Sequence, residues 1–542
     1  MKNFTTKRYV CAILLLFSAV LSALSIVYPA IGLLQWVSLI PAGIVILTKA
    51  TDATVKLKHM YLWGLLFFIS YFLTTYSWII SMYPLDFTGL NKLTALLFIL
   101  LAWIGLSLLF ALSYALSFVM LAMLARGKIT KKYAFMLPYA MAGLWVIFEW
   151  AQTLHWTGVP WGRLCLGQVN ILYTLQSASL FGSYFVTFLI VAVNFLIARA
   201  IIECKTAKLC ITVAVSIFTV NLLVGIIIHS STSSRLENAT NSVNVAAIQG
   251  NISVYEKWDY LEAITKPVEI HEELTRNAAE QGADIVIWSE TTLPYSLYEF
   301  PQVEKQLGDI AQKYGVTLVT GIFTDVYPDD ADPIFYNSII AFDSDGNLND
   351  TVYHKQHLVP FGEYVPCRNV VLKLLPFLGD ISMLSYDLTP GENASVFELN
   401  GVKAGAIICF DSIYESSTLE SVNNGAQFIM MATNESWFDG SRAMSMHNNQ
   451  AKLRAIECGR FIVRSANTGI SSVISPTGKS FCEVDELEEG FCIQSIPLPH
   501  DDITTLYSGI SNLFVYLNIA ALVCLVTINC TSVIYDRIKK KQ

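Results

Sequence analysis

The stretch GAIICFDSIYES, residues 405–416, is an apolar run that ends at Cys409 and continues directly into a polar segment able to form a helix. This pattern predicts a buried strand that stops at a sharp turn with a thiol at its tip. Such a turn holds a nucleophile rigidly and leaves backbone N–H groups free to meet an anion. Most free cysteines, however, are small buried hydrophobes, so this stretch alone leaves the structural and the reactive interpretation of Cys409 open.

The composition indicates a membrane half and a soluble half. The 542 residues exceed one ordinary soluble domain, and 54% hydrophobic with 14% charged residues is a balance typical of membrane segments. Residues 1–229 contain four acidic side chains against fifteen Lys and Arg, whereas residues 230–507 contain 38 acidic and 16 basic ones. Because no basic surface is indicated, the sequence argues against nucleic-acid binding.

Apolar runs close to the length of about 20 residues that a bilayer requires predict eight membrane spans. They lie at residues 9–26, 28–48, 59–80, 95–124, 134–152, 178–203, 209–229 and 510–534. No cleavage site separates the first run from the second, so we expect an uncleaved first helix rather than a signal peptide. The predicted domains are a bundle of seven spans in 1–229, a soluble catalytic domain in 230–507, and a membrane helix with a basic tail in 508–542.

The basic residues of the short loops predict the orientation in the membrane. With eight spans, the clusters at residues 7–8, 49–58, 126–132, 199–208 and 537–541 all fall on one side. The positive-inside rule assigns that side to the cytoplasm, so segment 230–507 lies outside it. One loop on the outer side, HWTGVPWGRLCLGQ at 155–168, interrupts the apolar pattern. Its tryptophans are either interfacial anchors or part of a route by which lipid reaches the soluble domain.

The soluble half alternates short apolar runs with amphipathic ones, which predicts an α/β domain with buried sheet covered by helices. We expect helices near 260–280, 302–314, 413–424 and 443–458. We expect strands at 243–250, 283–290, 316–323, 335–342, 402–410, 426–434, 461–469 and 471–478, enough for two sheets.

Three of the strand ends carry residues suited to acyl transfer. Glu290 follows the strand ADIVIWSE, Lys355 follows a short β-like run, and Cys409 ends its own strand. A carboxylate can take the thiol proton, and an ammonium with the backbone N–H of Phe410 can stabilise an oxyanion. Singly, Glu290 and Lys355 are as well explained as solvated surface charges, and Glu363 as an ion-pair partner. Together at strand ends they favour a site.

The five cysteines of the soluble half give no CxxC pair and no Cys/His cluster at zinc spacing, so we expect neither a metal nor another cofactor. Cys482 and Cys492 could pair, and the sequence does not settle whether they do.

Several longer sequence motifs resemble those of a known family. Glu290 in IWSETTLP, Lys355 in YHKQHLVPFGEYVP and Cys409 in IICFDSIYE are similar to the Glu–Lys–Cys triad of the nitrilase superfamily. With the membrane helices, several sequence motifs resemble the apolipoprotein N-acyltransferase family more specifically. They are QGN (249–251), TGVPWG (157–162), LVPFGEYVP (358–366), TNESWF (433–438), His447 to Gln450, RAIECGR (454–460) and RSANTGIS (464–471).

The resemblance implies an αββα sandwich on the periplasmic side of a bacterial inner membrane, with Glu290 as base, Lys355 as oxyanion stabiliser and Cys409 as nucleophile. Glu363 would support the lysine, and Trp258 in EKWDY matches a tryptophan on a mobile lid arm. Phe410 and Asp411 stand where the family often has Tyr and Glu.

The implied reaction takes an acyl chain from a membrane phospholipid onto Cys409 and passes it to the α-amino group of a diacylglyceryl-cysteine at the N-terminus of an apolipoprotein. One alternative keeps the triad but uses water as the acceptor, which makes a membrane-anchored amidase or hydrolase; an anchor, however, needs only one span. Another alternative is a transporter or receptor, but only one acid, Glu149, lies within a predicted span.

Overall fold

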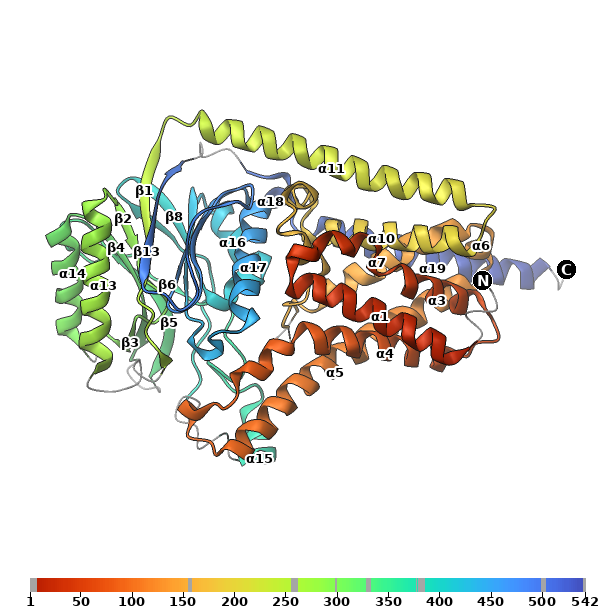
Figure 1. Cartoon of the computed structure of the whole chain (residues 1–542), viewed down its shortest axis with the longest axis horizontal. Coiled ribbons are helices and arrows are strands. Elements are labelled where there is room, and N and C mark those ends of the chain that lie inside the picture. Colours follow the sequence, from red (N-terminus) through yellow and green to blue (C-terminus); the bar gives the residue numbers. More distant parts are fainter. Residues whose placement is uncertain are drawn as a thin grey trace. The chain divides into compact units, whose positions relative to one another are not determined.

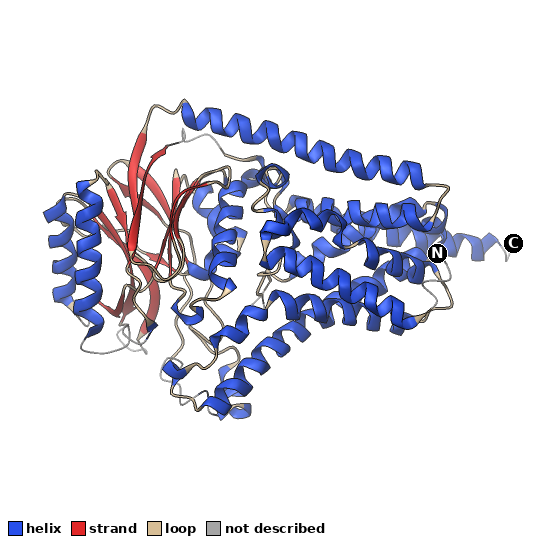
Figure 2. Cartoon of the chain, in the orientation of Figure 1, coloured by secondary structure: helices blue, strands red, loops and turns tan. Residues whose placement is uncertain are grey.

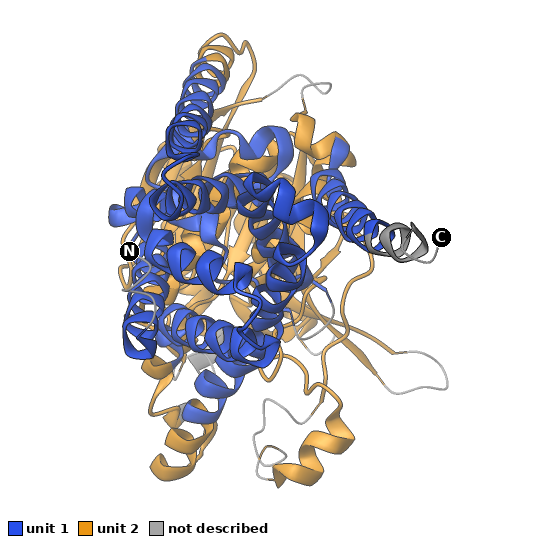
Figure 3. Cartoon of the chain, turned by 90° about the vertical axis from the view of Figure 1, so that its right-hand side faces the viewer, with its two compact units in different colours: residues 1–79, 100–230, 510–542 blue, residues 80–99, 231–509 orange. Residues whose placement is uncertain are grey.

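The computed structural model describes two compact units, coloured separately in Figure 3. One consists of residues 1–79, 100–230 and 510–542, and the other of residues 80–99 and 231–509. Segment 80–99, which the sequence prediction counted with the membrane half, thus belongs to the second unit. The described residues are 7–154, 158–254, 262–297, 300–327, 333–376, 378, 386–498 and 504–539.

The first unit is helical (Figure 2). Helix α10 packs against α3 and α7, while α1 packs against α3 and α4. The long helices are α1 (Arg8–Val27), α3 (Ile40–Thr51), α4 (Leu57–Thr75), α5 (Lys92–Ala125), α7 (Leu137–Ala151), α10 (Ser183–Ile202), α11 (Ala207–Glu237) and α19 (Leu513–Lys539). Short helices between them are α2 (Gln35–Ser38), α6 (Lys128–Lys132), α8 (Leu172–Leu175) and α9 (Ala178–Phe181).

Seven helices of the described chain are long and apolar enough to cross a membrane. They correspond to seven of the eight predicted spans, and α4 is the predicted span that is not among them. Its Lys58, His59, Tyr61 and Tyr71 lower its mean hydropathy, although its 19 residues approach the length that a span requires. A count of eight spans therefore stays a prediction.

The loop at 155–168 is described from residue 158 onward, and this part is folded into the helical unit. Tyr71 and Tyr76 donate hydrogen bonds to the carbonyls of Gly162 and Val159. Trp161 is only 3% exposed, which does not fit an anchor at a membrane surface. Because the first unit supplies partners for this irregular backbone, the loop can lie within a helical bundle. Its part in a lipid route stays a prediction.

The second unit is a sandwich of two mixed sheets, as predicted (Figure 1). One sheet has the order β13-β1-β2-β4-β5-β6, with β3 also paired to β4, and the other has the order β12-β11-β10-β9-β8-β7. The strands of the first sheet are β1 (Ser242–Gln249), β2 (Ile285–Ile287), β3 (Leu293–Ser296), β4 (Thr317–Val326), β5 (Ile334–Phe342), β6 (Tyr353–His354) and β13 (Gly490–Pro497). Those of the second are β7 (Val396–Leu399), β8 (Val402–Ile408), β9 (Phe428–Thr433), β10 (Phe461–Ala466), β11 (Ser471–Ile474) and β12 (Ser480–Val484).

Helices cover the outer face of each sheet and give the predicted αββα layers (Figures 1 and 2). Helices α13 (Glu262–Glu280) and α14 (Pro301–Tyr314) bury apolar side chains such as Val268 and Leu307 against the first sheet. Helices α16 (Glu415–Asn423) and α17 (Arg442–Cys458) cover the second in the same way. A third core, which includes Val245, Ile408 and Met430, lies between the sheets. Central strands are therefore buried on both faces, which explains their continuous apolar runs.

The sequence prediction missed four strands and one helix of the second unit, together with the short helix α18 (Leu506–Ile510) at its C-terminal end. Strand β3 is only four residues long, and β12 alternates half-buried with exposed residues. Strand β6, two residues long, is the short β-like run expected before Lys355. Strands β7 and β13 and helix α15 (Arg368–Leu374) also went unpredicted. These elements are short or lie at sheet edges, where the apolar pattern is weak.

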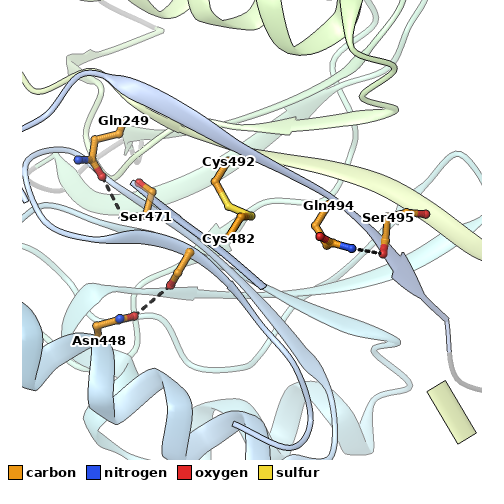
Figure 4. The surroundings of a disulfide bond; sticks show 8 residues. Gln249, Asn448, Ser471, Cys482, Cys492, Gln494 and Ser495 are labelled. Atoms are coloured by element: carbon orange, nitrogen blue, oxygen red, sulfur yellow. Dashed lines mark hydrogen bonds between the residues drawn. A yellow bond between two sulfur atoms is a disulfide. The ribbon is translucent and has the colours of Figure 1, made fainter. Parts of the chain in front are cut away.

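Cys482 and Cys492, whose pairing the sequence left open, form a disulfide (Figure 4). It joins β12 of one sheet to β13 of the other, across a sequence separation of 10 residues. The loop that it closes is held by Gln249, whose side-chain amide donates to the carbonyls of Asp485 and Glu488. The disulfide therefore ties the two sheets together at one edge of the sandwich.

Candidate active site

Strand β2 of one sheet and the parallel strands β8 and β9 of the other end close together, because a residue after β2 accepts a hydrogen bond from a residue after β9. Glu290 follows β2, Cys409 follows β8, and Asn434 follows β9. The backbone has positive φ at Thr291 (44°) and at Cys409 (46°). Such angles are strained for residues with a side chain, and strained backbone often occurs where a chain presents functional groups.

Glu290 is buried, and both of its carboxylate oxygens are hydrogen-bonded. Oε1 accepts from Lys355 Nζ at 2.9 Å and from Asn337 Nδ2 at 2.7 Å. Oε2 accepts from the backbone N–H of Asn434 at 2.8 Å. The carboxylate is thus fixed by groups from three different segments of the chain, one of which is the strand end next to β8.

Lys355 follows β6 and is 1% exposed. Its Nζ also donates to Glu363 Oε1 at 3.0 Å, so one ammonium joins two carboxylates. Burial by itself lowers the pKa of Lys355, but the charges of Glu290 and Glu363 outweigh burial and raise the pKa well above its usual value. The side chain therefore remains a cation inside the protein.

Glu363 lies in the predicted turn after Lys355. Its Oε1 accepts from Asn337 Nδ2 at 2.8 Å as well as from Lys355, and its Oε2 accepts from the backbone N–H of Val359 at 2.8 Å. Burial raises the pKa of Glu363, and the nearby charge of Glu290 adds to that rise, while Lys355 opposes it. Asn337 thus bridges two carboxylates that would otherwise repel each other.

Cys409 lies close enough to Glu290 and Lys355 for both charges to act on its thiol. Burial raises the pKa of Cys409 to about 12, and the negative charge of Glu290 adds to the rise. Lys355 acts in the opposite direction, together with the Thr433 side chain and the Asn434 backbone N–H. At neutral pH the sulfur is a thiol, so a reaction at this atom needs a base to take its proton.

The residues after Cys409 form a short 3₁₀ turn, Cys409–Ile413. Phe410 is 7% exposed and its ring packs edge-on against Tyr414 at 5.7 Å. Asp411 is fully buried and accepts hydrogen bonds from the protein on both oxygens, including one from the backbone N–H of Ile408 at 3.0 Å. Its shorter side chain, compared with the family's usual Glu, therefore serves the turn itself. Trp258, the residue expected on a lid arm, lies outside the described residues.

A buried polar network behind the nucleophile was not predicted from the sequence. His447 on α17 contacts the carbonyl oxygen of Cys409 at 3.0 Å through Nε2 and Glu435 at 2.7 Å through Nδ1. Arg464 pairs with the same carboxylate of Glu435. Burial lowers the pKa of His447 to about 4, so the ring is neutral at neutral pH. All three residues lie in stretches that resemble the family, namely TNESWF, His447 to Gln450 and RSANTGIS, but only the fold shows what they contact.

Asn337 was also missed, and its only signal was an amide inside the otherwise apolar strand FYNSIIAF.

Within the described chain, no group of three or more His, Cys, Asp or Glu side chains is arranged to hold a metal ion. The arrangement places the buried carboxylate of Glu290 and the buried ammonium of Lys355 beside the half-buried thiol of Cys409. Such a cluster is suited to a nucleophilic attack by sulfur on a carbonyl group.

Two family models match the chain. The apolipoprotein N-acyltransferase N-terminal domain matches residues 18–196, and the carbon-nitrogen hydrolase domain matches residues 244–500. The second match contains Glu290, Lys355 and Cys409.

Curated relatives match both parts of the chain. An apolipoprotein N-acyltransferase of Geobacter metallireducens is 28% identical over 87% of this chain and 86% of its own length. The apolipoprotein N-acyltransferase of Allorhizobium ampelinum is 33% identical over 63% of this chain, and the match spans just under two thirds (64%) of that relative. A solved amidase from Nesterenkonia sp. is 16% identical, with a TM-score of 0.36 over 51% of this chain and 95% of its own.

Proposed function

We propose that this chain, which belongs to the apolipoprotein N-acyltransferase family, transfers an acyl chain from a membrane phospholipid to the N-terminus of apolipoproteins. The acceptor is the α-amino group of the N-terminal diacylglyceryl-cysteine. The acyl chain passes through a thioester on Cys409, so the reaction has two half-reactions of the ping-pong kind. A thioester keeps the acyl group activated for attack by an amine, and no nucleotide is required.

In the first half-reaction, Glu290 takes the proton of Cys409 and the thiolate attacks the ester carbonyl carbon of the phospholipid. The carbonyl oxygen becomes an oxyanion, which the Lys355 ammonium and the Phe410 backbone N–H stabilise. When the oxyanion collapses, the ester C–O bond breaks. The leaving alkoxide takes the proton from Glu290 and departs as a lysophospholipid.

In the second half-reaction, the acceptor amine attacks the thioester carbonyl and gives a proton to Glu290. Collapse of this second oxyanion breaks the C–S bond, forms the amide, and returns the proton to the Cys409 sulfur. Glu363 supports both steps by keeping Lys355 charged in a buried place, where an isolated ammonium would lose its proton.

The observation that carries this proposal is the buried Lys355–Glu290 contact of 2.9 Å beside a thiol whose pKa responds to both charges. A thiol with a pKa raised to about 12 needs a base close to its sulfur, and Glu290 is a carboxylate whose charge acts on it. The same cluster provides the cation for the oxyanion. The family membership favours transfer to an amine over the hydrolase alternative.

We also propose that the catalytic unit lies on the periplasmic side of a bacterial inner membrane. Seven helices of the described chain can span a membrane, and the basic residues of the short loops favour a cytoplasmic location for those loops. The disulfide between Cys482 and Cys492 supports the same orientation, because structural disulfides form mainly in oxidising compartments outside the cytoplasm.

The test is intact-mass measurement of the purified chain after exposure to phospholipid vesicles that contain one kind of acyl chain. We expect one acyl adduct on wild-type protein, its absence from Cys409→Ala and Glu290→Gln, and its loss when a diacylglyceryl peptide is added. Detection of the acylated peptide completes the transfer. An adduct that persists in Cys409→Ala contradicts the role of the sulfur, and release of free fatty acid in place of acylated peptide supports the hydrolase.

A further inference from the structure

The segment that carries Lys355 is joined to the turn that carries Cys409 by one buried carboxylate. Asp411 Oδ2 accepts from the hydroxyl of Tyr353 at 2.7 Å and from the backbone N–H of Ile408 at 3.0 Å. Asp411 Oδ1 accepts from the backbone N–H of His357 at 2.8 Å. Asp411 therefore contacts the residues two before and two after Lys355, and also the residue directly before Cys409.

The side chain of His357 adds a fourth hydrogen bond to this carboxylate, the second that comes from His357. Its Nδ1 lies 3.1 Å from Asp411 Oδ1 and 3.1 Å from the hydroxyl oxygen of Ser417. Because both oxygens of Asp411 accept hydrogen bonds from other donors, Nδ1 carries the proton and donates. The ring is stacked on Tyr414, with ring centres 4.0 Å apart and planes at 12°. The orientation of the imidazole is thus fixed on one face and along one edge.

We propose that His357 is a positioning residue that acts through Asp411 and holds the Lys355 ammonium at its working distance from the Cys409 sulfur. The proposal rests on the proposed function for its effect on acyl transfer. His357 itself contacts neither Lys355 Nζ nor the reacting sulfur in any described interaction. Replacing the His357 side chain removes its hydrogen bond to Asp411 but leaves the backbone hydrogen bond of residue 357 in place. The segment that carries Lys355 therefore becomes more mobile but stays attached to Asp411.

The physical reason that a small displacement matters is the low polarity of the site. The charge of Lys355 lowers the pKa of Cys409 and stabilises the oxyanion only over a short range. A misplacement of about 1 Å in a catalytic group can reduce a rate by roughly 100-fold. Moving the ammonium away from the sulfur therefore weakens both effects together.

The sharpest comparison is His357→Asn with His357→Gln. The side-chain amide nitrogen of asparagine can take the place of Nδ1 and donate to Asp411, whereas that of glutamine takes the place of the more distant Nε2. Gln356→Ala is the matched control, because Gln356 lies in the same segment but donates to Glu420 at 2.9 Å rather than to Asp411.

The first measurement does not involve lipid transfer. The rate of Cys409 alkylation by iodoacetamide is measured from pH 7 to pH 9 on the full chain in detergent micelles, with the peptide identified by mass spectrometry. Well below the pKa of the thiol, this rate is proportional to the fraction of Cys409 present as thiolate. We expect the rate to fall roughly 10-fold in His357→Gln, because the cation acts less strongly on the sulfur, and to stay near wild type in His357→Asn and Gln356→Ala.

The second measurement is the rate of acyl-adduct formation from phospholipid vesicles. We expect His357→Gln to lower the maximal rate roughly 10- to 100-fold with little change in the KM for phospholipid, and His357→Asn to restore most of it. If the two variants behave alike in the alkylation assay, or if His357→Gln matches Gln356→Ala, the positioning role is wrong. If wild-type protein forms no adduct, the proposed function fails, while the alkylation rates still decide the role of His357.

Discussion

Lys355 Nζ lies 2.9 Å from Glu290 Oε1, with 2% and 7% of the two side chains exposed. Lys355 also contacts Glu363 at 3.0 Å, so one buried cation serves two buried carboxylates. Removing an ion from water is costly, and the cost is recovered only where opposite charges and hydrogen bonds surround it. Asn337, Asn434 and Val359 supply those hydrogen bonds here. The cluster is consequently sensitive to the loss of its single cation.

Lys355→Met should abolish formation of the acyl adduct and also destabilise the protein. The substitution leaves Glu290 and Glu363 buried without a counter-charge, a loss typically worth about 3–5 kcal/mol in the free energy of unfolding. Thermal unfolding of the full chain in detergent measures the second effect, and intact mass measures the first. Lys313→Met is the control, because Lys313 is exposed and its partner Glu272 is only half-buried, so this pair should matter much less. Equal melting temperatures for the two variants would contradict the prediction.

The pH dependence of stability should carry a contribution from His447. Its pKa is lowered by burial from 6.5 to about 4, so between these values the unfolded chain binds a proton that the folded chain does not. Stability is therefore fully present above pH 6.5 and falls as the pH drops towards 4. We expect the melting temperature of His447→Asn to fall less over this interval than that of wild type. An identical pH slope in both proteins shows that His447 does not contribute.

Reduction of the Cys482–Cys492 disulfide should destabilise the second unit without removing any catalytic group. Closing a loop of this size restricts the unfolded chain and typically contributes about 2–4 kcal/mol. We expect reductant to lower the melting temperature of wild type and of Cys367→Ser, which lacks only an exposed free thiol. The double variant Cys482→Ser/Cys492→Ser should start lower and not respond. If reductant also lowers the melting temperature of the double variant, its effect comes from a site other than this disulfide, and the prediction is wrong.

Gly321→Ala should reduce the acylation rate although Gly321 carries no chemistry. A Cβ at this position of β4 would lie 2.7 Å from Glu290 Cα and from the backbone N of Thr291. Atoms do not approach so closely, so the strand end that presents Glu290 has to shift. Gly509→Ala is the control, because a Cβ there meets nothing within 4 Å. The rate of adduct formation is measured for both variants. A normal rate for Gly321→Ala contradicts the prediction, because it shows that the strand end can shift without displacing the Glu290 carboxylate.

Much of the second unit could be predicted from local pattern. The strands that were found are central ones, buried on both faces, and their apolar runs are long enough to stand out, as in β5 and β8. The edge strand β12 was missed because the neighbouring strand, rather than its own side chains, holds it in extended form.

The sequence by itself determined which segments are apolar enough to span a membrane or form central strands, because both depend on side chains close together along the chain. It also marked Glu290, Lys355 and Cys409 as groups at strand ends. Only the tertiary structure decided that Asn337 bridges two carboxylates, that His447 contacts the carbonyl of Cys409, and that Asp411 joins the Lys355 segment to the Cys409 turn. Those contacts join residues up to 58 positions apart, and the packing of the two sheets sets which of them meet.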